Sequence, residues 1–252
     1  RLFEPEIFKN DEKINEVVNL ISKAKKPIFY IGGGCINSGP KAAELVSQFV
    51  ETTGAPATMT LMGLGVLGSS HSNSLGMLGM HGMYEANMAM HECDLLINIG
   101  ARFDDRVTGR LDAFSPNSKK IHIDIDESNI NKTIKVDVPV VGDVTSILKR
   151  VVKVWKDNNL KTNKSDLKLW WDKINNWKKI DCLHFTNNEK EIKPQYAIQR
   201  LYELTKDRKT FITTEVGQHQ MWAAQYYKFE KPNRWLTSGG LGTMGYGFPA
   251  AI

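Results

Sequence analysis

Short continuous apolar runs alternate along this chain with segments whose apolar residues recur at helical spacing. Residues 11–25 place their apolar side chains on one helical face, with Asn10 or Asp11 as the expected N-cap. Residues 28–31 then form an apolar run between a proline and three glycines. A run of this kind is typical of a strand that is buried on both faces.

The same alternation continues through the first 155 residues. Strands are expected at 57–61, 95–99, 121–125 and 138–141, and helices at 41–52, 84–92 and 145–155. Strands separated by helices favour an open parallel sheet with helices on both faces. We therefore predict that residues 1–155 form one doubly wound α/β domain, whose strand order is not readable from the sequence.

The character of the chain changes after this domain. Residues 156–193 are predicted to be a linker that holds a Trp-rich helix, in which aromatic residues at spacings of three and four indicate a core or interface stripe rather than a cofactor site. A helix after Pro194 and a strand at 211–214 start the alternation again, so residues 194–252 are predicted to begin a second, truncated α/β domain. The first residue is not Met, and an apolar helix is expected to start just before Ile252, which together suggest an internal piece of a longer protein.

Composition excludes several classes of protein. The 252 residues are 41% hydrophobic and carry a net charge of +5, which is ordinary for a soluble globular chain. The excess charge is spread over Lys-rich helices, so a solvated surface is favoured over a nucleic-acid patch. No apolar run is long enough to cross a membrane. Cys35, Cys93 and Cys182 lack metal-ligand spacing, and their odd number favours a reducing interior over secretion.

Ligands of open α/β sheets bind beyond the carboxyl ends of the strands, so the loops at these ends are the first candidates for a site. Residues 32–34 are three glycines, which suit either a close ligand or merely a tight strand-to-helix turn. Residues 63–68 and 75–83 are rich in Gly and Met, which suits either the face of a flat ring or ordinary core packing.

Two later loops carry charge. In residues 100–110, Arg102 and Arg106 flank Asp104 and Asp105, and guanidinium groups at a strand end favour a diphosphate over a self-neutralising surface loop. The next expected strand ends in acidic residues, the type that accepts hydrogen bonds from ribose hydroxyls.

These acidic residues are Asp124, Asp126 and Glu127, and the last strand is followed by Asp143, which could simply cap a helix. We expect residues 100–106 and 124–127 to border one dinucleotide crevice. No residues here pair as nucleophile and base, which indicates a binding domain, and the histidines show no metal-ligand pattern.

With these residues, the chain resembles the catalytic subunits of the acetohydroxyacid synthase (acetolactate synthase) family of thiamine-diphosphate enzymes. The matching strings include Gly-Met-His-Gly at 79–82, Tyr-Glu-Ala-Asn at 84–87, Cys-Asp-Leu-Leu at 93–96, Gly-Ala-Arg-Phe-Asp-Asp-Arg-Val-Thr-Gly at 100–109 and His-Ile-Asp-Ile-Asp at 122–126. They continue with Glu-Val-Gly-Gln-His-Gln-Met-Trp-Ala at 215–223 and Ser-Gly-Gly-Leu-Gly-Thr-Met-Gly-Tyr-Gly-Phe-Pro-Ala-Ala at 238–251. The Trp-rich linker carries no such string.

The resemblance implies a central FAD-binding domain followed by the start of a thiamine-diphosphate-binding domain, with a structural FAD. The implied FAD residues are Gly33, Gly34, Leu61, Met62, His81, Gly82, Gly100, Arg102, Asp104, Arg106, Asp124, Ile125, Gly142, Asp143 and Val144. Met80, Asp105 and Arg106 fall at the family's substrate channel. The implied thiamine-diphosphate residues are Val216, Gly217, Gln218, His219, Gly242 and Met244.

The resemblance also implies an activity that this stretch does not hold complete. The family condenses two pyruvates, or pyruvate and 2-ketobutyrate, with loss of CO2 in branched-chain amino-acid synthesis. Its activating Glu would precede Arg1, and its Mg2+ motif would follow Ile252, so no catalytic or metal residue is assigned and the fragment alone is expected to be inactive.

A homodimer or homotetramer, a small regulatory subunit, and a cytoplasmic or organellar location are implied as well. The alternatives are another thiamine-diphosphate enzyme, such as pyruvate oxidase or glyoxylate carboligase, and a non-catalytic flavin-nucleotide-binding module.

Overall fold

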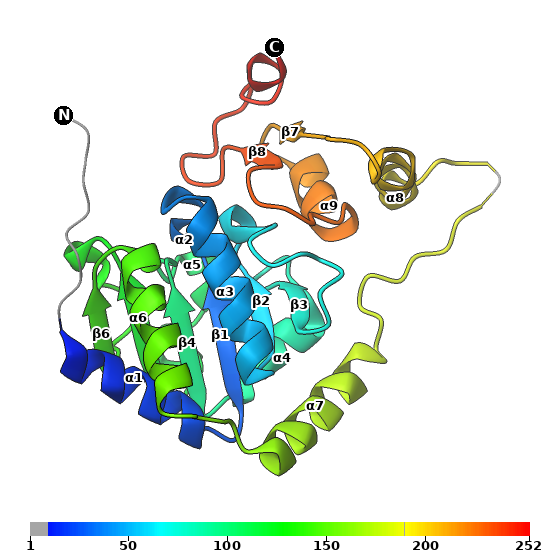
Figure 1. Cartoon of the computed structure of the whole chain (residues 1–252). Helices are drawn as coiled ribbons and strands as arrows, with labels where there is room; N and C mark the ends of the chain where they lie inside the picture. The colour runs from blue at the N-terminus through cyan, green and yellow to red at the C-terminus, as the bar shows by residue number, and fades with distance from the viewer. Residues whose placement is uncertain (1–9, 189) are drawn as a thin grey trace, which may run out of the picture.

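The computed structural model describes residues 10–188 and 190–252, which form two lobes of unequal size (Figure 1). The first lobe, residues 10–178, is built on one six-stranded parallel sheet in the order β3-β2-β1-β4-β5-β6. The strands are β1 Pro27–Ile31, β2 Ala57–Met59, β3 Ser74–Met77, β4 Leu95–Ile99, β5 Lys119–Asp124 and β6 Val138–Val141. Parallel strands joined by crossovers on both sides confirm the predicted doubly wound α/β fold.

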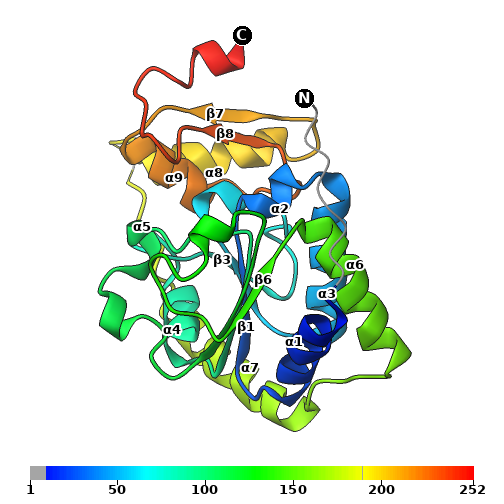
Figure 2. The ribbon, with the colours of Figure 1, turned by 90° about the vertical axis from the view of Figure 1, so that its left-hand side faces the viewer.

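Helices cover both faces of this sheet, as the edge-on view in Figure 2 shows. Helices α1 Asp11–Lys23, α3 Pro40–Thr53 and α6 Val144–Asp157 bury apolar residues against one face. Helices α4 Tyr84–Glu92 and α7 Lys164–Lys178 cover the other. Two short helices, α2 Gly34–Asn37 and α5 Asp105–Thr108, follow the carboxyl ends of β1 and β4. All five residues of β1 and of β4 are buried, which explains why these strands read as continuous apolar runs.

Local signals in the sequence place the ends of several helices. Asn10 is the N-cap of α1, where its side chain accepts a hydrogen bond from the Lys13 N–H at 3.0 Å. Asp143 likewise caps α6 by accepting from the Ser146 N–H at 2.9 Å. The capping role that the sequence allowed for Asp143 is therefore confirmed.

Two expectations about secondary structure were wrong. The strand expected at 57–61 ends at Met59, and Leu61 begins the 3-10 turn η1 Leu61–Gly63. The Gly- and Met-rich stretch expected to be a loop contains β3, an edge strand whose alternate residues are only half buried. Where an apolar helix is expected to start, just before Ile252, the structure has the 3-10 turn η4 Pro249–Ala251.

The Trp-rich helix α7 packs against the first lobe. Trp170 is 1% exposed, and its indole N–H donates to the Pro27 carbonyl at 3.1 Å. Trp171 donates to the Gly54 carbonyl at 2.8 Å, so α7 is tied to the sheet on one side and to the end of α3 on the other. The stripe is a core stripe, as expected, and α7 is part of the packing of the first lobe although it lies beyond residue 155.

The second lobe, residues 194–252, is smaller and more open. It contains α8 Pro194–Thr205, β7 Ile212–Thr214, α9 Gln218–Tyr226 and β8 Trp235–Thr237, with β7 and β8 paired in parallel. This lobe lies above the carboxyl ends of the first sheet in both views (Figures 1 and 2). The Gln225 side chain donates to the His81 carbonyl at 2.8 Å, and Ser70 donates to Glu230 at 2.8 Å, so the lobes are in direct contact.

Candidate functional site

Backbone hydrogen bonds link the carboxyl ends of the central strands into one continuous edge, which we call the strand-end edge. Gly32 N–H donates to the Ile99 carbonyl at 2.9 Å, and Gly100 N–H donates to the Ile123 carbonyl at 2.8 Å. Gly142 N–H donates to the Asp124 carbonyl at 2.8 Å. The loops after β1, β4, β5 and β6 therefore leave the sheet side by side.

Two glycines of this edge are required by a close approach of the backbone. A Cβ on Gly34 would lie 2.7 Å from the Gly100 Cα, and a Cβ on Gly100 would lie 2.8 Å from the Gly34 Cα. Gly100 also has φ of +65°, a conformation that side chains disfavour. Of the two interpretations left open for the glycine run after β1, the structure therefore supports the tight turn.

The loop after β4 directs its charged side chains outward. Arg102 and Asp104 form an ion pair at 2.7 Å, and both side chains are more than half exposed. Phe103 between them is 1% exposed and points into the lobe. This alternation leaves a guanidinium on the surface at the carboxyl end of β4, directly beside β5.

A second loop is held against the same region. The Asn87 side chain accepts from Gly79 N–H at 2.8 Å and donates to the Gly79 carbonyl at 2.9 Å. Met80 N–H donates to the Arg106 carbonyl at 2.8 Å, and the Arg106 guanidinium lies 3.7 Å from the Met80 sulfur. Met80, Asp105 and Arg106, the expected channel residues, line one shared hollow of about 380 Å³.

The Asp124 carboxylate at the end of β5 is buried and already bonded within its own turn. It accepts from Asp126 N–H at 2.9 Å and lies 3.5 Å from His122 Nε2. Burial alone raises the pKa of this carboxyl, but the contacts with His122 and Asp126 N–H outweigh burial and lower the pKa below its usual value. Asp124 is thus ionised, whereas Asp126 and Glu127 are the exposed carboxylates of this turn.

The residues expected to bind thiamine diphosphate lie at the carboxyl ends of β7 and β8. Gly217 is the N-cap of α9, so Val216, Gln218 and His219 surround the start of this helix. Gly245 N–H donates to the Glu215 carboxylate at 3.0 Å, which holds the loop after β8 beside the end of β7. Gly242 and Met244 both lie in that loop, and the Met244 side chain is 80% exposed.

The structure thus collects the expected residues into two neighbouring groups. The FAD set lies on the strand-end edge and on the 61–62 and 80–82 loops, and residues 100–106 and 124–127 lie side by side on neighbouring strands. The thiamine-diphosphate set lies in the lobe above. The groups approach each other at Gly239, where an added side chain would collide with the Met62 sulfur.

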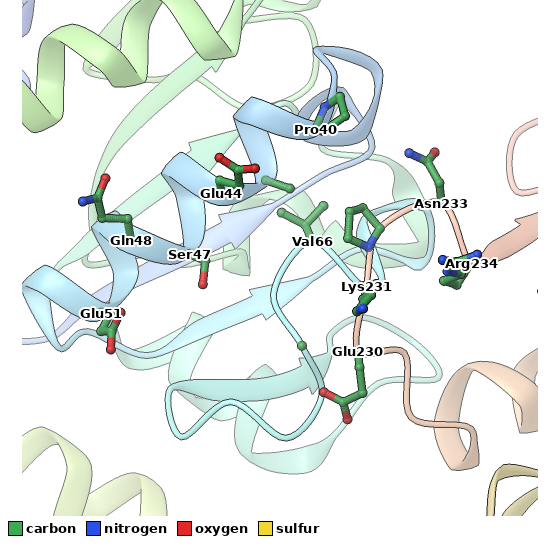
Figure 3. Close-up of a pocket in the computed structure, with 14 residues that line it drawn as sticks. Pro40, Glu44, Ser47, Gln48, Glu51, Val66, Glu230, Lys231, Asn233 and Arg234 are labelled. Atoms are coloured by element: carbon green, nitrogen blue, oxygen red, sulfur yellow. The ribbon is translucent and has the colours of Figure 1, made fainter. Parts of the chain in front are cut away.

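A different hollow is larger but lies away from these residues. It has a volume of about 750 Å³ and separates α3 from the 230–234 loop, with Glu44, Glu51 and Arg234 on its walls (Figure 3). None of the residues assigned to a cofactor lines it.

Over the described ranges 10–188 and 190–252, no three His, Cys, Asp or Glu side chains gather closely enough to bind a metal ion. Within the same ranges, no helix combines the length and apolar character that crossing a bilayer requires.

Sequence reasoning missed the residues beneath the site. Asn98 and Phe103 were not singled out, and of His122 the sequence indicated only that it follows no metal-ligand pattern, whereas the structure buries it completely. A buried Asn within an otherwise apolar strand was the one available signal for this layer.

The sequence matches known families over both lobes. Residues 14–151 match the family described as "Thiamine pyrophosphate enzyme, central domain", and residues 215–252 match "Thiamine pyrophosphate enzyme, C-terminal TPP binding domain". The chain is 46% identical over 252 residues to the acetolactate synthase large subunit of Buchnera aphidicola subsp. Schizaphis graminum, covering all of this chain and 43% of that protein.

Other relatives give the same result. Identity is 42% over 252 residues with the acetolactate synthase isozyme 3 large subunit of Escherichia coli, covering all of this chain and 43% of that protein. It is 49% over 242 residues with the chloroplastic acetolactate synthase of Arabidopsis thaliana, covering 96% of this chain and 35% of that protein. The chain thus spans less than half the length of these relatives. With a central-domain match over more than half of its residues, the chain belongs to the thiamine pyrophosphate enzyme family.

Proposed function

We propose that this chain is part of the large, catalytic subunit of an acetolactate synthase. The whole protein would join two pyruvates, or pyruvate and 2-ketobutyrate, with loss of CO2 in branched-chain amino-acid synthesis. The proposal rests on the positions of the two groups of loops. The charged loops of the strand-end edge lie directly under the lobe that matches a thiamine-diphosphate-binding domain.

The strand-end edge has side chains that fit FAD. Arg102 and Arg106 are exposed guanidinium groups that can pair with a diphosphate, and Asp126 and Glu127 are exposed acceptors for ribose hydroxyls. Met62 and Ile125 are 40% and 49% exposed on the same edge and offer apolar surface to a ring. In this proposal the FAD is structural, and residues 1–155 are its domain.

The second lobe has groups that fit a diphosphate and a ring. The start of α9 presents backbone N–H groups of Gln218 and His219, and a helix N-terminus favours phosphate. The exposed Met244 side chain offers apolar support for the ring. When bound, thiamine diphosphate would supply the electron sink for decarboxylation, while these residues hold and orient it. Mg2+ would be bound by residues outside the described ranges.

The hollow at Met80, Asp105 and Arg106 is the proposed path for the 2-ketoacid. The Arg106 guanidinium provides a positive charge that can attract a carboxylate. We further propose a homodimer or homotetramer that takes a small regulatory subunit, because relatives are named large subunits. The location would be the bacterial cytoplasm or an organelle, since relatives include bacterial and chloroplastic proteins.

The test is turnover of the full-length protein with pyruvate, with and without thiamine diphosphate, Mg2+ and FAD. Acetolactate without peroxide is the expected product. Peroxide formed with oxygen consumption would instead identify an oxidase of the same family. Bound flavin without any thiamine-dependent turnover would identify a non-catalytic nucleotide-binding module.

A further inference from the structure

A row of polar side chains crosses the interior of the first sheet. Thr58, Tyr30, Asn98 and His122 occupy equivalent positions on β2, β1, β4 and β5, each paired in register with the next. All four are at most 1% exposed. Polar groups at such depth are costly unless they are hydrogen-bonded, so the partners of each one matter.

Two members of the row bond to the backbone of the same residue, Ala101. Asn98 Oδ1 accepts from Ala101 N–H at 3.0 Å, and Asn98 Nδ2 donates to the Ala101 carbonyl at 2.7 Å. His122 Nε2 lies 2.9 Å from the same carbonyl. A carbonyl only accepts, so Nε2 carries the proton and makes the third hydrogen bond to Ala101.

This arrangement is not optimal for stability. The other ring nitrogen, Nδ1, has no partner among the described residues. A buried polar atom without a partner costs free energy, and an apolar side chain of the same shape would avoid that cost. What His122 does contact is the Ala101 carbonyl and, at 3.5 Å, the Asp124 carboxylate.

The hydrogen bonds to the Ala101 N–H and carbonyl fix the start of the loop that follows this residue. Phe103 has φ of +59°, an uncommon conformation for a bulky residue. Its ring is fixed edge-on by His122 at 5.1 Å and by Phe114 at 5.9 Å between centroids. With Phe103 turned inward, its neighbours Arg102 and Asp104 turn outward, where they pair at 2.7 Å.

We propose that Asn98 and His122 are positioning residues for the dinucleotide: they lock the Ala101 peptide and so hold the Arg102 guanidinium where the diphosphate of FAD binds. The inference rests on the proposed function, because it takes FAD to bind at the strand-end edge. Neither side chain touches the ligand in this proposal. Asn98 acts through Ala101, and His122 acts through Ala101 and Phe103 and through its contact with Asp124.

The test is the FAD dissociation constant of the full-length protein, measured by flavin fluorescence in equilibrium titrations. Asn98→Leu removes both hydrogen bonds while keeping the number and branching of the side-chain heavy atoms, and it is expected to weaken FAD binding about tenfold, equivalent to about 1.4 kcal/mol. Thr58→Val is the matched control: Thr58 belongs to the same buried row, but its hydroxyl donates to the Gly76 carbonyl at 2.9 Å. The control is expected to lower the melting temperature while changing FAD affinity less than about twofold.

His122 gives an independent pair of variants. His122→Phe keeps a ring against Phe103 and removes the unpartnered Nδ1, so it is expected to fold well and yet bind FAD more weakly. His122→Gln retains a donor that can reach the Ala101 carbonyl and is expected to recover most of the affinity. If Asn98→Leu does not fold, these two variants still test the positioning role.

A double-mutant cycle separates positioning from a general loss of structure. If Asn98 acts through Arg102, then Asn98→Leu is expected to have little further effect in an Arg102→Gln background. Both single variants are also expected to reduce the salt dependence of FAD binding, because Arg102→Gln removes the positive charge and Asn98→Leu lets it move away from the diphosphate. Additive effects, or wild-type affinity in Asn98→Leu and His122→Phe, would overturn the positioning role. Failure of the wild-type protein to bind FAD would instead overturn the proposed FAD site.

Discussion

The two lobes differ in how much of their structure they stabilise by themselves. In the first lobe, five helices enclose a sheet whose central strands are fully buried. In the second lobe, the only sheet among the described residues has two strands of three residues each, and no residue of α8 is buried. Leu241, Met244 and Phe248 are each more than 70% exposed.

This difference indicates which contacts stabilise the fold of each lobe. A two-stranded sheet is marginally stable alone, so the second lobe depends on the surfaces that it contacts. Polar contacts to the first lobe include those of Gln225 to the His81 carbonyl and of Glu230 to Ser70, and Phe229 and Tyr227 belong to the same apolar core cluster as first-lobe residues. The first lobe is therefore the rigid part of the site, and the second lobe lies over it in a position that is set by its contacts with the first lobe.

The largest expected contrast lies in thiol reactivity. Burial raises the pKa of the Cys35 thiol to about 12 and that of Cys93 to about 11, and both lie in the core of the first lobe. Cys182, between the lobes, is exposed. Native alkylation near pH 8, followed by peptide mass spectrometry, should label Cys182 more than about a thousandfold faster. In urea the three rates should converge, and rapid native labelling of Cys35 would contradict a rigid first lobe.

A second test compares one buried Trp from each lobe. Trp170→Phe removes a bonded indole from the first lobe and is expected to cost about 2–4 kcal/mol of unfolding free energy. Trp235 is 8% exposed, and its indole N–H has no partner among the described residues. Trp235→Phe should therefore cost only about 1 kcal/mol or less, because it also removes an unsatisfied donor. Urea unfolding, combined with hydrogen exchange of β1 and β8, measures the loss of unfolding free energy in each variant. Equal losses in the two variants would contradict the expected difference between the lobes.

The smallest expected effect concerns pH. The pKa of Asp124 is lowered in the folded protein, so its contribution to stability is complete above its usual pKa of 3.8 and is lost as the pH falls through the lower folded value. Asp124→Asn should remove this part of the acid dependence and leave the second lobe unaffected. Urea midpoints between pH 5 and pH 2 measure the change, and parallel curves for wild type and variant would show that Asp124 makes no such contribution.

The sequence predicted the parts of the fold that depend on local pattern. The buried runs of β1 and β4 and the caps at Asn10 and Asp143 were readable because each is a short-range signal. Strand β3 was missed because it has only four residues, which include Gly76, and lies within a Gly- and Met-rich stretch typical of a loop. The strand order was not readable because pairing between β1 and β4 joins residues almost 70 positions apart.

The candidate site was predicted in part for the same reason. The charged loops at 100–106 and 124–127 followed from the rule that ligands bind beyond parallel strand ends. The support beneath them did not follow, because the contact from His122 to Ala101 depends on the register between β4 and β5. The bonds from Asn98 to Ala101 join residues only three positions apart, but no motif in the sequence marks them. A resemblance to a family names residues at the surface of a site more readily than those that hold the surface in place.

The close approach of Gly34 and Gly100 has a consequence for how such a scaffold can diversify. Neither position accepts even a methyl group without moving the backbone of the opposite strand end. New binding preferences on this framework must therefore arise from exchangeable side chains around the glycines, at positions such as Met62, Met80 and Ile125. Selection can thus change the ligand while leaving the underlying backbone untouched.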